Sequence, residues 1–451
     1  MRIRVRIILL SLLMAFVSLK VYSQNNNDGQ LPSYFKENIS QKSSLVKEWI
    51  KHSSDCFFFW TDSHLNANDG YTPEIIEHAS KVWNIKTPKI VFGGDIIPSF
   101  VDDMTPFIKQ YEGQCEYLKG FGRVYPARGN HDFTFKYAPG KPEGVTYDNA
   151  STSDIFRRSM TLDNVVHNAA DPGSSYYYFD EKKSKIRYVI LDSSDYIKDT
   201  SRGFGIVDSI SVEQRRWIFR KSILGAPKKY SILIVSHAPQ FAYGADSPTE
   251  QVMQGLSALS THSPIILDGE EYRFDQRRDL KLLAVFSGHL HHDMQIYQNA
   301  VLHIMMMGDV RYRDFKRDPF LDSDYTRKTG TINAHAVDFV CVLKKLNAIA
   351  AVRLGAGPDR LFYLSPIVLK VGEEYTIEPN KKAKRTVIYD AKADFVKNEA
   401  EKYSYIWKLN HSVASVKDTG VVTALTQGEA TLMVERHNGL REFYYIKVEN
   451  E

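Results

Sequence analysis

Five polar clusters in the sequence contain residue types that bind metal ions. Each cluster follows a run of apolar residues, and each supplies aspartate, asparagine or histidine. Imidazole nitrogens combined with carboxylate and amide oxygens, without thiolates, suit divalent metals such as Mn, Fe, Zn or Ni. The clusters are Asp62-Ser63-His64, Gly94-Asp95, Gly129-Asn130-His131-Asp132, His237 and Gly288-His289-Leu290-His291.

The number of candidate ligands indicates more than one metal. A single catalytic zinc takes about three or four protein ligands. Two metals that share a carboxylate need more, and such pairs clamp the attacking and leaving oxygens of a phosphoryl displacement. The sequence therefore predicts two divalent ions per chain, on Asp62, His64, Asp95, Asn130, His237, His289 and His291.

The apolar runs before these clusters are expected to be strands. They cover residues 56–60, 89–92, 122–127, 231–235 and 282–286, and helix-like stretches such as 73–82 and 211–224 separate several of them. Strands that alternate with helices predict an α/β protein. Ligands of such sheets bind beyond the carboxyl ends of the strands, which is where all five clusters fall.

In this order, the clusters resemble the calcineurin-like metallophosphoesterase superfamily. Its pattern is Asp-x-His, Gly-Asp, Gly-Asn-His-Asp/Glu, a lone His and Gly-His-x-His, and the resemblance covers residues 55–354. It implies a metal-dependent phosphoric ester hydrolase, built as a β-sandwich of two mixed sheets flanked by helices. It also implies one metal on Asp62, His64 and His291, a second on Asn130, His237 and His289, and Asp95 bridging both.

The resemblance implies a mechanism and two further site residues. A hydroxide that bridges the metals attacks phosphorus, while His131 binds phosphate and protonates the leaving oxygen. Asp132 is expected to orient a ligand histidine, because metal-bound histidines need a partner for their other nitrogen. The sequence after Asp95 lacks both the Asp-Arg-Gly of Ser/Thr protein phosphatases and the Tyr of purple acid phosphatases.

The charge near the motifs bears on the phosphate-ester substrate. Apolar Ile96, Ile97 and Pro98 follow Asp95, so few cations stand near the metals to bind a doubly charged monoester. This favours phosphodiester or mixed mono- and diester hydrolysis. The alternatives are a strict phosphomonoesterase and an inactive surface-binding protein.

The first 23 residues resemble a secretory signal peptide. Arg2, Arg4 and Arg6 precede an apolar run at residues 7–19, and Ser23 is a small residue at the cleavage position. A transmembrane anchor is the alternative, but the run is too short to cross the roughly 30 Å hydrocarbon core. We therefore expect a periplasmic or extracellular protein that begins at Gln24.

Charge and cysteine content exclude two further classes. Of 451 residues, 58 are Lys or Arg and 54 are Asp or Glu, and the excess of +4 lies within the signal segment. The balanced remainder indicates no nucleic-acid-binding surface. Three cysteines, Cys56, Cys115 and Cys341, are too few for a disulfide scaffold, and we expect buried thiols.

The last part of the chain has a different pattern. Strand-like runs at residues 367–371, 403–409, 431–435 and 443–448 predict a small all-β sandwich. Residues 413–416, 419–424 and 428–431 resemble a bacterial Ig-like group 2 domain, which could contact a cell surface or glycan. The predicted plan is a signal peptide at 1–23, an N-terminal lead at 24–54, a phosphoesterase domain at 55–360 and an Ig-like domain at 361–451. The natural substrate, the metal identity and the oligomeric state stay open.

Overall fold

The computed structural model describes most of the chain between Leu31 and Asn450. The described residues are 31–65, 70–96, 105–132, 134–136, 146–148, 155, 157–171, 173–195, 210–239, 248–291, 293–309, 327–377, 383–390, 396–398, 404–406 and 412–450. The predicted signal peptide, Ile97 and Pro98 lie outside them.

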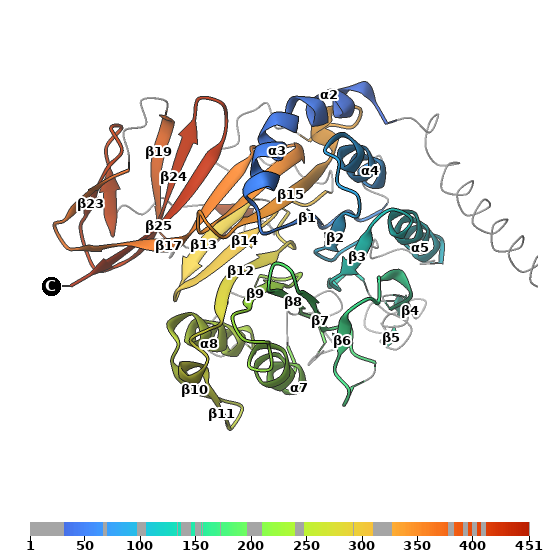
Figure 1. Ribbon diagram of the computed structural model, residues 1–451, viewed down its shortest axis with the longest axis horizontal. Coiled ribbons are helices and arrows are strands. Elements are labelled where there is room, and N and C mark those ends of the chain that lie inside the picture. The colour runs from blue at the N-terminus through green and yellow to red at the C-terminus, as the bar shows by residue number, and fades with distance from the viewer. Residues whose placement is uncertain are drawn as a thin grey trace, which may run out of the picture.

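Two large sheets dominate the described residues (Figure 1). The first contains, in spatial order, β19 (Ala383–Asp390), β24 (Gly428–Arg436), β25 (Arg441–Glu449), β17 (Arg360–Lys370), β16 (Ala348–Gly355), β15 (Ala336–Leu343), β1 (Asp55–Trp60), β2 (Lys89–Phe92) and β3 (Arg123–Pro126). The second contains β13 (Met294–Gln298), β14 (Val301–Met305), β12 (Lys281–Ser287), β9 (Ser231–Val235), β8 (Ile186–Ile190), β7 (Tyr177–Glu181) and β6 (Val165–His167).

Smaller elements complete the described chain. The helices are α2 (Ser33–Gln41), α3 (Ser43–His52), α4 (Thr72–Val82), α5 (Thr105–Lys119), α7 (Val212–Arg216), the π-helix η2 (Trp217–Ile223), α8 (Pro248–Thr261), and the 3₁₀ turns η3 (Phe274–Gln276) and η5 (Ile332–Ala334). The remaining strands are β4 (Thr134–Lys136) with β5 (Thr146–Asp148), β10 (Pro264–Leu267) with β11 (Glu270–Arg273), β20 (Val396–Asn398) with β21 (Ser404–Ile406), and β18 (Glu374–Thr376), β23 (Val421–Ala424) and β22 (Ala414–Val416).

Both large sheets are mixed. Strands β1, β2 and β3 run parallel, as do β8, β9, β12 and β14, whereas β15–β17 and β6, β7 and β13 pair antiparallel. Within each sheet, neighbouring parallel strands end at the same edge. The polar loops that follow these strands therefore lie side by side. The mixed α/β architecture predicted from the sequence is confirmed.

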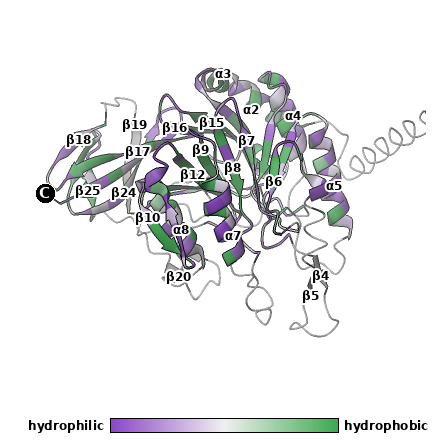
Figure 2. Cartoon of the chain, turned by 60° about the horizontal axis from the view of Figure 1, so that its bottom comes forward, coloured by the Kyte–Doolittle hydropathy of each residue, from purple (hydrophilic) through white to green (hydrophobic). Residues whose placement is uncertain are grey.

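Strand β1 shows why the molecule is layered. Phe57 and Phe59 pack between the two sheets, while Phe58 and Trp60 pack on the opposite face beneath helices. Successive side chains of a strand point to opposite faces, so an unbroken apolar run requires cover on both. The covering helices are amphipathic, and Figure 2 shows a hydrophobic side and a hydrophilic side on α5 and α7.

The described part of the N-terminal lead, from Leu31 on, is part of the core. The predicted plan separated residues 24–54 from the phosphoesterase domain, but helices α2 and α3 pack on the first sheet. Their side chains Phe35, Ile39 and Val46 are buried in the same cluster as Phe58 and Trp60.

The C-terminal strands continue the first sheet. Strand β17 contains the predicted domain boundary at residue 360/361, and it pairs with β16 on one side and with β25 on the other. Two aromatic contacts join the parts: the rings of Phe362 and Phe443 lie 5.3 Å apart, and those of Tyr297 and Tyr445 lie 3.8 Å apart. The sheet β18-β23-β22 shares a separate core with β24 and β25. An Ig-like identity for this region stays a prediction.

Two further features concern the length of the helices and the state of the cysteines. Within the described ranges, no helix has the length and apolar character needed to span a bilayer. The three cysteines are unpaired thiols, with Cys115 and Cys341 buried and Cys56 partly exposed. The prediction of buried thiols is wrong for Cys56, whose Sγ lies 3.1 Å from Cys341 Sγ at the edge of the first sheet's core.

Candidate metal centre

The five strand-end loops bring all nine predicted site residues into one place. Asp62 and His64 follow β1, Asp95 follows β2, and Asn130, His131 and Asp132 follow β3. The second sheet contributes His237 after β9 and the pair His289 and His291 after β12. The edge where the two sheets meet therefore gathers side chains separated by more than 200 positions in the sequence.

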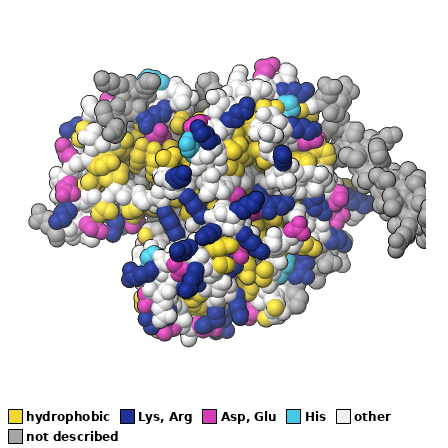
Figure 3. All heavy atoms as spheres, in the orientation of Figure 1, with side chains coloured by type: hydrophobic (Ala, Val, Ile, Leu, Met, Phe, Trp, Pro, Cys, Tyr) yellow, Lys and Arg dark blue, Asp and Glu magenta, His cyan; other side chains and the backbone are white. Residues whose placement is uncertain are grey.

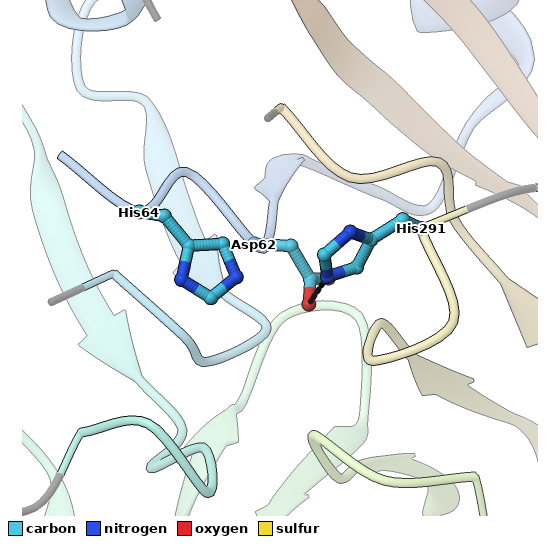
Figure 4. Close-up of side chains that lie close together, drawn as sticks. All are labelled: Asp62, His64 and His291. Carbon is cyan, nitrogen blue, oxygen red and sulfur yellow. Dashed lines mark ion pairs between the residues drawn. The ribbon is translucent and has the colours of Figure 1, made fainter. Parts of the chain in front are cut away.

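One group of side chains consists of Asp62, His64 and His291. Their ligand atoms all lie within 4.8 Å of one another, which is close enough to hold a metal ion. His291 Nε2 is 3.1 Å from Asp62 Oδ1, the ion pair drawn in Figure 4. The Thr61 hydroxyl donates a 2.8 Å hydrogen bond to Asp62 Oδ2 and so fixes this carboxylate.

A second group consists of Asp95, His237 and His289, with Asn130 beside them. His237 Nε2 is 3.0 Å from Asp95 Oδ2. Asn130 Oδ1 lies 3.1 Å from His237 Nε2 and 3.1 Å from His289 Nδ1. Three potential ligand atoms thus point at one another, as expected of donors arranged around a common centre.

Asp95 lies between the two groups. Its Oδ2 atom is 3.9 Å from His64 Nε2, 3.9 Å from His131 Nε2 and 3.0 Å from His237 Nε2. Asp95 is almost fully buried, so both groups meet over a carboxylate that water barely reaches. Its carboxylate therefore faces imidazoles of both groups.

A backbone hydrogen bond on the side away from Asp95 fixes the ring orientation of His237. Its Nδ1 atom is 2.8 Å from the carbonyl oxygen of Gly93, and a carbonyl can only accept a hydrogen bond. Nδ1 must therefore carry a proton and donate it, which directs Nε2 towards Asp95. Metal-ligating histidines commonly have this kind of partner on the distal nitrogen.

Asp132 was expected to orient a ligand histidine. In the structure its carboxylate accepts hydrogen bonds from the backbone N–H groups of Gly129, Asp95 and Ile96, at 2.8, 2.8 and 2.9 Å. Asp132 is fully buried. It ties the loop after β3 to the loop after β2, so its contacts position Asn130 and Asp95 relative to each other.

The site is built on an unusual backbone. Asp62, His64, Asp95, His289 and His291 all have positive φ angles, between 36° and 71°. Non-glycine residues rarely adopt this conformation, and it clusters at functional sites where the surrounding structure imposes it. The strain indicates that these side chains are held for their positions.

Two glycines allow the loops to approach each other. A Cβ atom on Gly129 would lie 2.2 Å from Asp95 Oδ1, and one on Gly288 would lie 2.3 Å from Asp62 Oδ2. Both distances are far below van der Waals contact. Glycine is therefore required at these positions for the two carboxylates to lie where they do.

Buried carboxylates and imidazoles set the electrostatics of the site. Burial alone would raise the pKa of Asp62, but His291 outweighs it and lowers this pKa to about 2. Burial would also raise the pKa of Asp95, but His237 and His131 outweigh it and hold this pKa well below its usual range. Although burial disfavours charge on His237, Asp95 raises its pKa to about 10. The centre therefore attracts positive charge strongly.

For His64 and His131, the pKa shifts in the opposite direction from that of His237. Burial lowers the pKa of His64 to about 3, and it also lowers the pKa of His131. Both rings are therefore neutral near pH 7, the state in which an imidazole nitrogen can bind a metal or accept a hydrogen bond. His131 and His291 are more exposed than His237, with side-chain exposures of 27%, 20% and 0%. They lie on the more exposed side of the centre.

Two arginines that lie near the Gly129 motif in the sequence pair with carboxylates other than the candidate ligands. Arg128, next to the Gly129 motif, is buried and forms an ion pair with buried Asp192. Arg158 lies on the surface and pairs with Glu112 at 3.0 Å. Sequence reasoning missed Asp192 and its neighbour Ser193, whose Oγ accepts a 3.2 Å hydrogen bond from Ala238 N. Their signal was a polar pair directly after the apolar run of β8.

The family model for calcineurin-like phosphoesterases matches residues 51–293, more than half of the chain. The chain belongs to this family. Membership in the calcineurin-like family supports a hydrolase that acts on phosphate esters, and the Asp and His groups of the site could hold a metal.

Among solved structures, one match is the crystal structure of phosphopantetheinyl hydrolase from Mycobacterium tuberculosis. It is 11% identical, with a TM-score of 0.29, and the match covers 59% of this calcineurin-like chain and 93% of the other. A similarity at this level carries no inference about substrate. A search of curated proteins found no match.

Proposed function

We propose that the chain is a phosphoesterase that binds two divalent ions and hydrolyses phosphodiesters, or diesters and monoesters together. The observation that supports this most is the position of Asp95, whose Oδ2 lies within 3.9 Å of imidazoles from both ligand groups. Asp62, His64 and His291 would hold one ion, and Asn130, His237 and His289 the other, with Asp95 shared.

The donor set fits this assignment chemically. Imidazole nitrogens, carboxylates and one amide suit Mn, Fe, Zn or Ni. Asp95 raises the pKa of His237 to about 10, so a proton there offsets the buried carboxylates when no metal is bound. Bound divalent ions would supply positive charge for the phosphoryl transition state. They would also lower the pKa of a water molecule bound to them, so that hydroxide is available near neutral pH.

His131 is the residue proposed to act on the substrate. Its backbone N–H donates a 2.8 Å hydrogen bond to Asp95 Oδ1, which ties the residue to the shared carboxylate. Its ring lies on the more exposed side of the centre. From there its ring can donate a hydrogen bond to a phosphate oxygen. The negative charge of the bound phosphate favours the protonated imidazole, which can then deliver its proton to the leaving oxygen. Asp132 would act through position, by holding the loops that carry Asn130 and Asp95.

The distribution of cations supports the diester preference. A monoester carries up to two negative charges and a diester one, so a monoesterase gains more from an additional cation. Arg128, the cation nearest in sequence to the motif, has its charge offset by Asp192 behind the loop. A strict phosphomonoesterase is the alternative. It would need a cation from elsewhere, for example from residues outside the described ranges.

The test compares two substrates on one metal-loaded preparation. We expect kcat/KM for bis-nitrophenyl phosphate to equal or exceed that for nitrophenyl phosphate. A monoester preference of about a hundredfold would establish the alternative. Absence of turnover of either ester, with metals bound, would support an inactive surface-binding protein.

We further propose that the protein is exported, on the basis of its first 23 residues, and that residues 361–451 form an Ig-like module able to contact a cell surface or glycan. N-terminal sequencing of the protein recovered from culture tests the first point. A protein that retains Met1 would contradict cleavage before Gln24.

A further inference from the structure

A concentration of basic residues lies at the edge of the second sheet opposite the metal centre. Four turns meet there, at residues 182–185, 227–230, 277–281 and 344–347. Together they contain eight lysines, two arginines and a single acid, Asp279. The basic residues are Lys182, Lys183, Lys185, Lys228, Lys229, Arg277, Arg278, Lys281, Lys344 and Lys345, and we call this surface the lysine edge.

Hydrogen bonds show that the four turns are neighbours. Ser231 N donates to Lys185 O at 2.9 Å, and Lys281 N donates to Tyr230 O at 3.3 Å. Lys344 Nζ donates to Lys185 O at 3.4 Å, and Lys281 Nζ donates to the side chain of Asn347. These bonds join each turn to the next, although the turns are far apart in sequence.

The charge of the lysine edge faces solvent. All its basic residues are exposed except Arg277 and Lys344, which are partly buried. Its acid, Asp279, is already paired with Arg277 at 3.0 Å. Figure 3 shows Lys and Arg side chains gathered across the middle of the displayed face, where Figure 1 draws β8, β9 and β12. Because the chain after the signal segment has no net charge, this concentration is local.

An apolar side chain stands within the basic surface. Leu346, in the turn beside Lys344 and Lys345, is 58% exposed. A soluble polyanion would gain nothing from an exposed leucine, whereas a bilayer accepts apolar side chains below its anionic head groups. The combination of clustered lysines with an exposed leucine therefore favours a membrane surface as the partner.

We propose that the lysine edge docks the protein on the surface of an anionic phospholipid bilayer. Strands β9 and β12 run from this edge to the loops of the metal centre, over five and seven residues. At about 3.3 Å per residue they separate the two by roughly 17–23 Å. A docked molecule would keep its metal centre directed away from the lipid and open to substrates in solution.

The test measures cosedimentation with vesicles of phosphatidylcholine alone, or with about one third phosphatidylglycerol. The chain is produced from Gln24, so that the apolar signal segment contributes nothing and every described contact is kept. We expect binding only to the anionic vesicles, and release at about 0.5 M salt because screening weakens surface attraction. Failure of the wild-type protein to bind anionic vesicles would refute the proposal.

Matched variants locate the binding surface. Lys183→Glu, Lys228→Glu and Lys345→Glu combined should weaken binding at least about a hundredfold, since each lysine near an anionic membrane contributes roughly fivefold. The control combines Lys81→Glu, Lys109→Glu and Lys417→Glu, which are exposed lysines outside the four turns. It changes the net charge equally and should retain binding. An equal loss in both variants would reduce the effect to net charge and overturn the proposal.

Leu346→Ser separates a bilayer from a soluble polyanion. It should weaken vesicle binding roughly tenfold, because an inserted leucine is lost, and leave binding to heparin or single-stranded DNA unchanged. Vesicle binding unaffected by Leu346→Ser, together with equally tight DNA binding, would identify a polyanion surface instead. Circular dichroism checks that each variant folds. If the triple lysine variant does not fold, Leu346→Ser and the salt dependence of wild-type binding test the proposal. Esterase turnover is expected to be unchanged in all variants, which keeps this test independent of the catalytic proposal.

Discussion

Gly129→Ala tests whether the close approach of two loops builds the metal centre. The added Cβ would lie 2.2 Å from Asp95 Oδ1 and 2.4 Å from Asp95 N. Ordinary contact begins at 3.4 Å, so the Asp95 carboxylate must move by about 1.2 Å. Displacements of about 1 Å at a catalytic site can cost roughly 10²-fold in rate, and overpacking costs about 1–3 kcal/mol of stability.

The assay combines kcat/KM for an aryl phosphate diester with thermal unfolding. We expect Gly129→Ala to lose about a hundredfold in kcat/KM. Gly113→Ala is the control, because a Cβ there meets no atom within 4 Å on helix α5. It should keep full activity and gain about 0.5–1 kcal/mol from helix propensity. Unchanged activity in Gly129→Ala would refute the claim that this glycine sets the position of Asp95.

Three other predictions follow from individual side chains. His131→Ala should keep its metals but lose about 10²–10⁴-fold in rate, more for a phenyl ester than for a nitrophenyl ester; loss of metal would make His131 a ligand instead. Arg128→Ala leaves buried Asp192 without its counter-charge, although Ser175 and Ser194 still donate hydrogen bonds to it, so denaturant unfolding should show a loss of about 3 kcal/mol, whereas Arg158→Ala at the surface should change little. Burial raises the pKa of Cys115 to about 12, so a thiol reagent should modify partly exposed Cys56 first in the folded protein. Modification of Cys115 at the same rate would contradict its burial.

The convergence of the candidate ligands could be predicted from the sequence because its signals are local. Each ligand directly follows a strand, and the shared edge of parallel strands makes adjacent loops converge. The orientations of side chains within the loops could not be predicted in the same way. Arg128 pairs with Asp192, and Asp132 accepts from three backbone N–H groups, through contacts that depend on how the chain packs.

Long-range packing also explains the differences in domain organisation. The N-terminal lead is mostly polar, so its apolar residues Phe35, Ile39 and Val46 were not recognised as core positions. They lie on the buried sides of the short helices α2 and α3. The apparent boundary near residue 360 coincides with the start of a strand that continues the sheet, because β17 pairs with both neighbours at once. Turn signals indicate where a chain changes direction, but they do not show whether the sheet also ends.

The central claim is that two metals share Asp95. Elemental analysis of well-loaded wild type and Asp95→Asn tests it most directly, with His64→Ala and His237→Ala as controls that should each empty mainly one site. The account predicts two metals per chain in wild type and reduced occupancy at both sites in Asp95→Asn, because the Asp95 carboxylate lies beside imidazoles of both ligand groups. Two metals retained in Asp95→Asn, or fewer than two in well-loaded wild type, would contradict it.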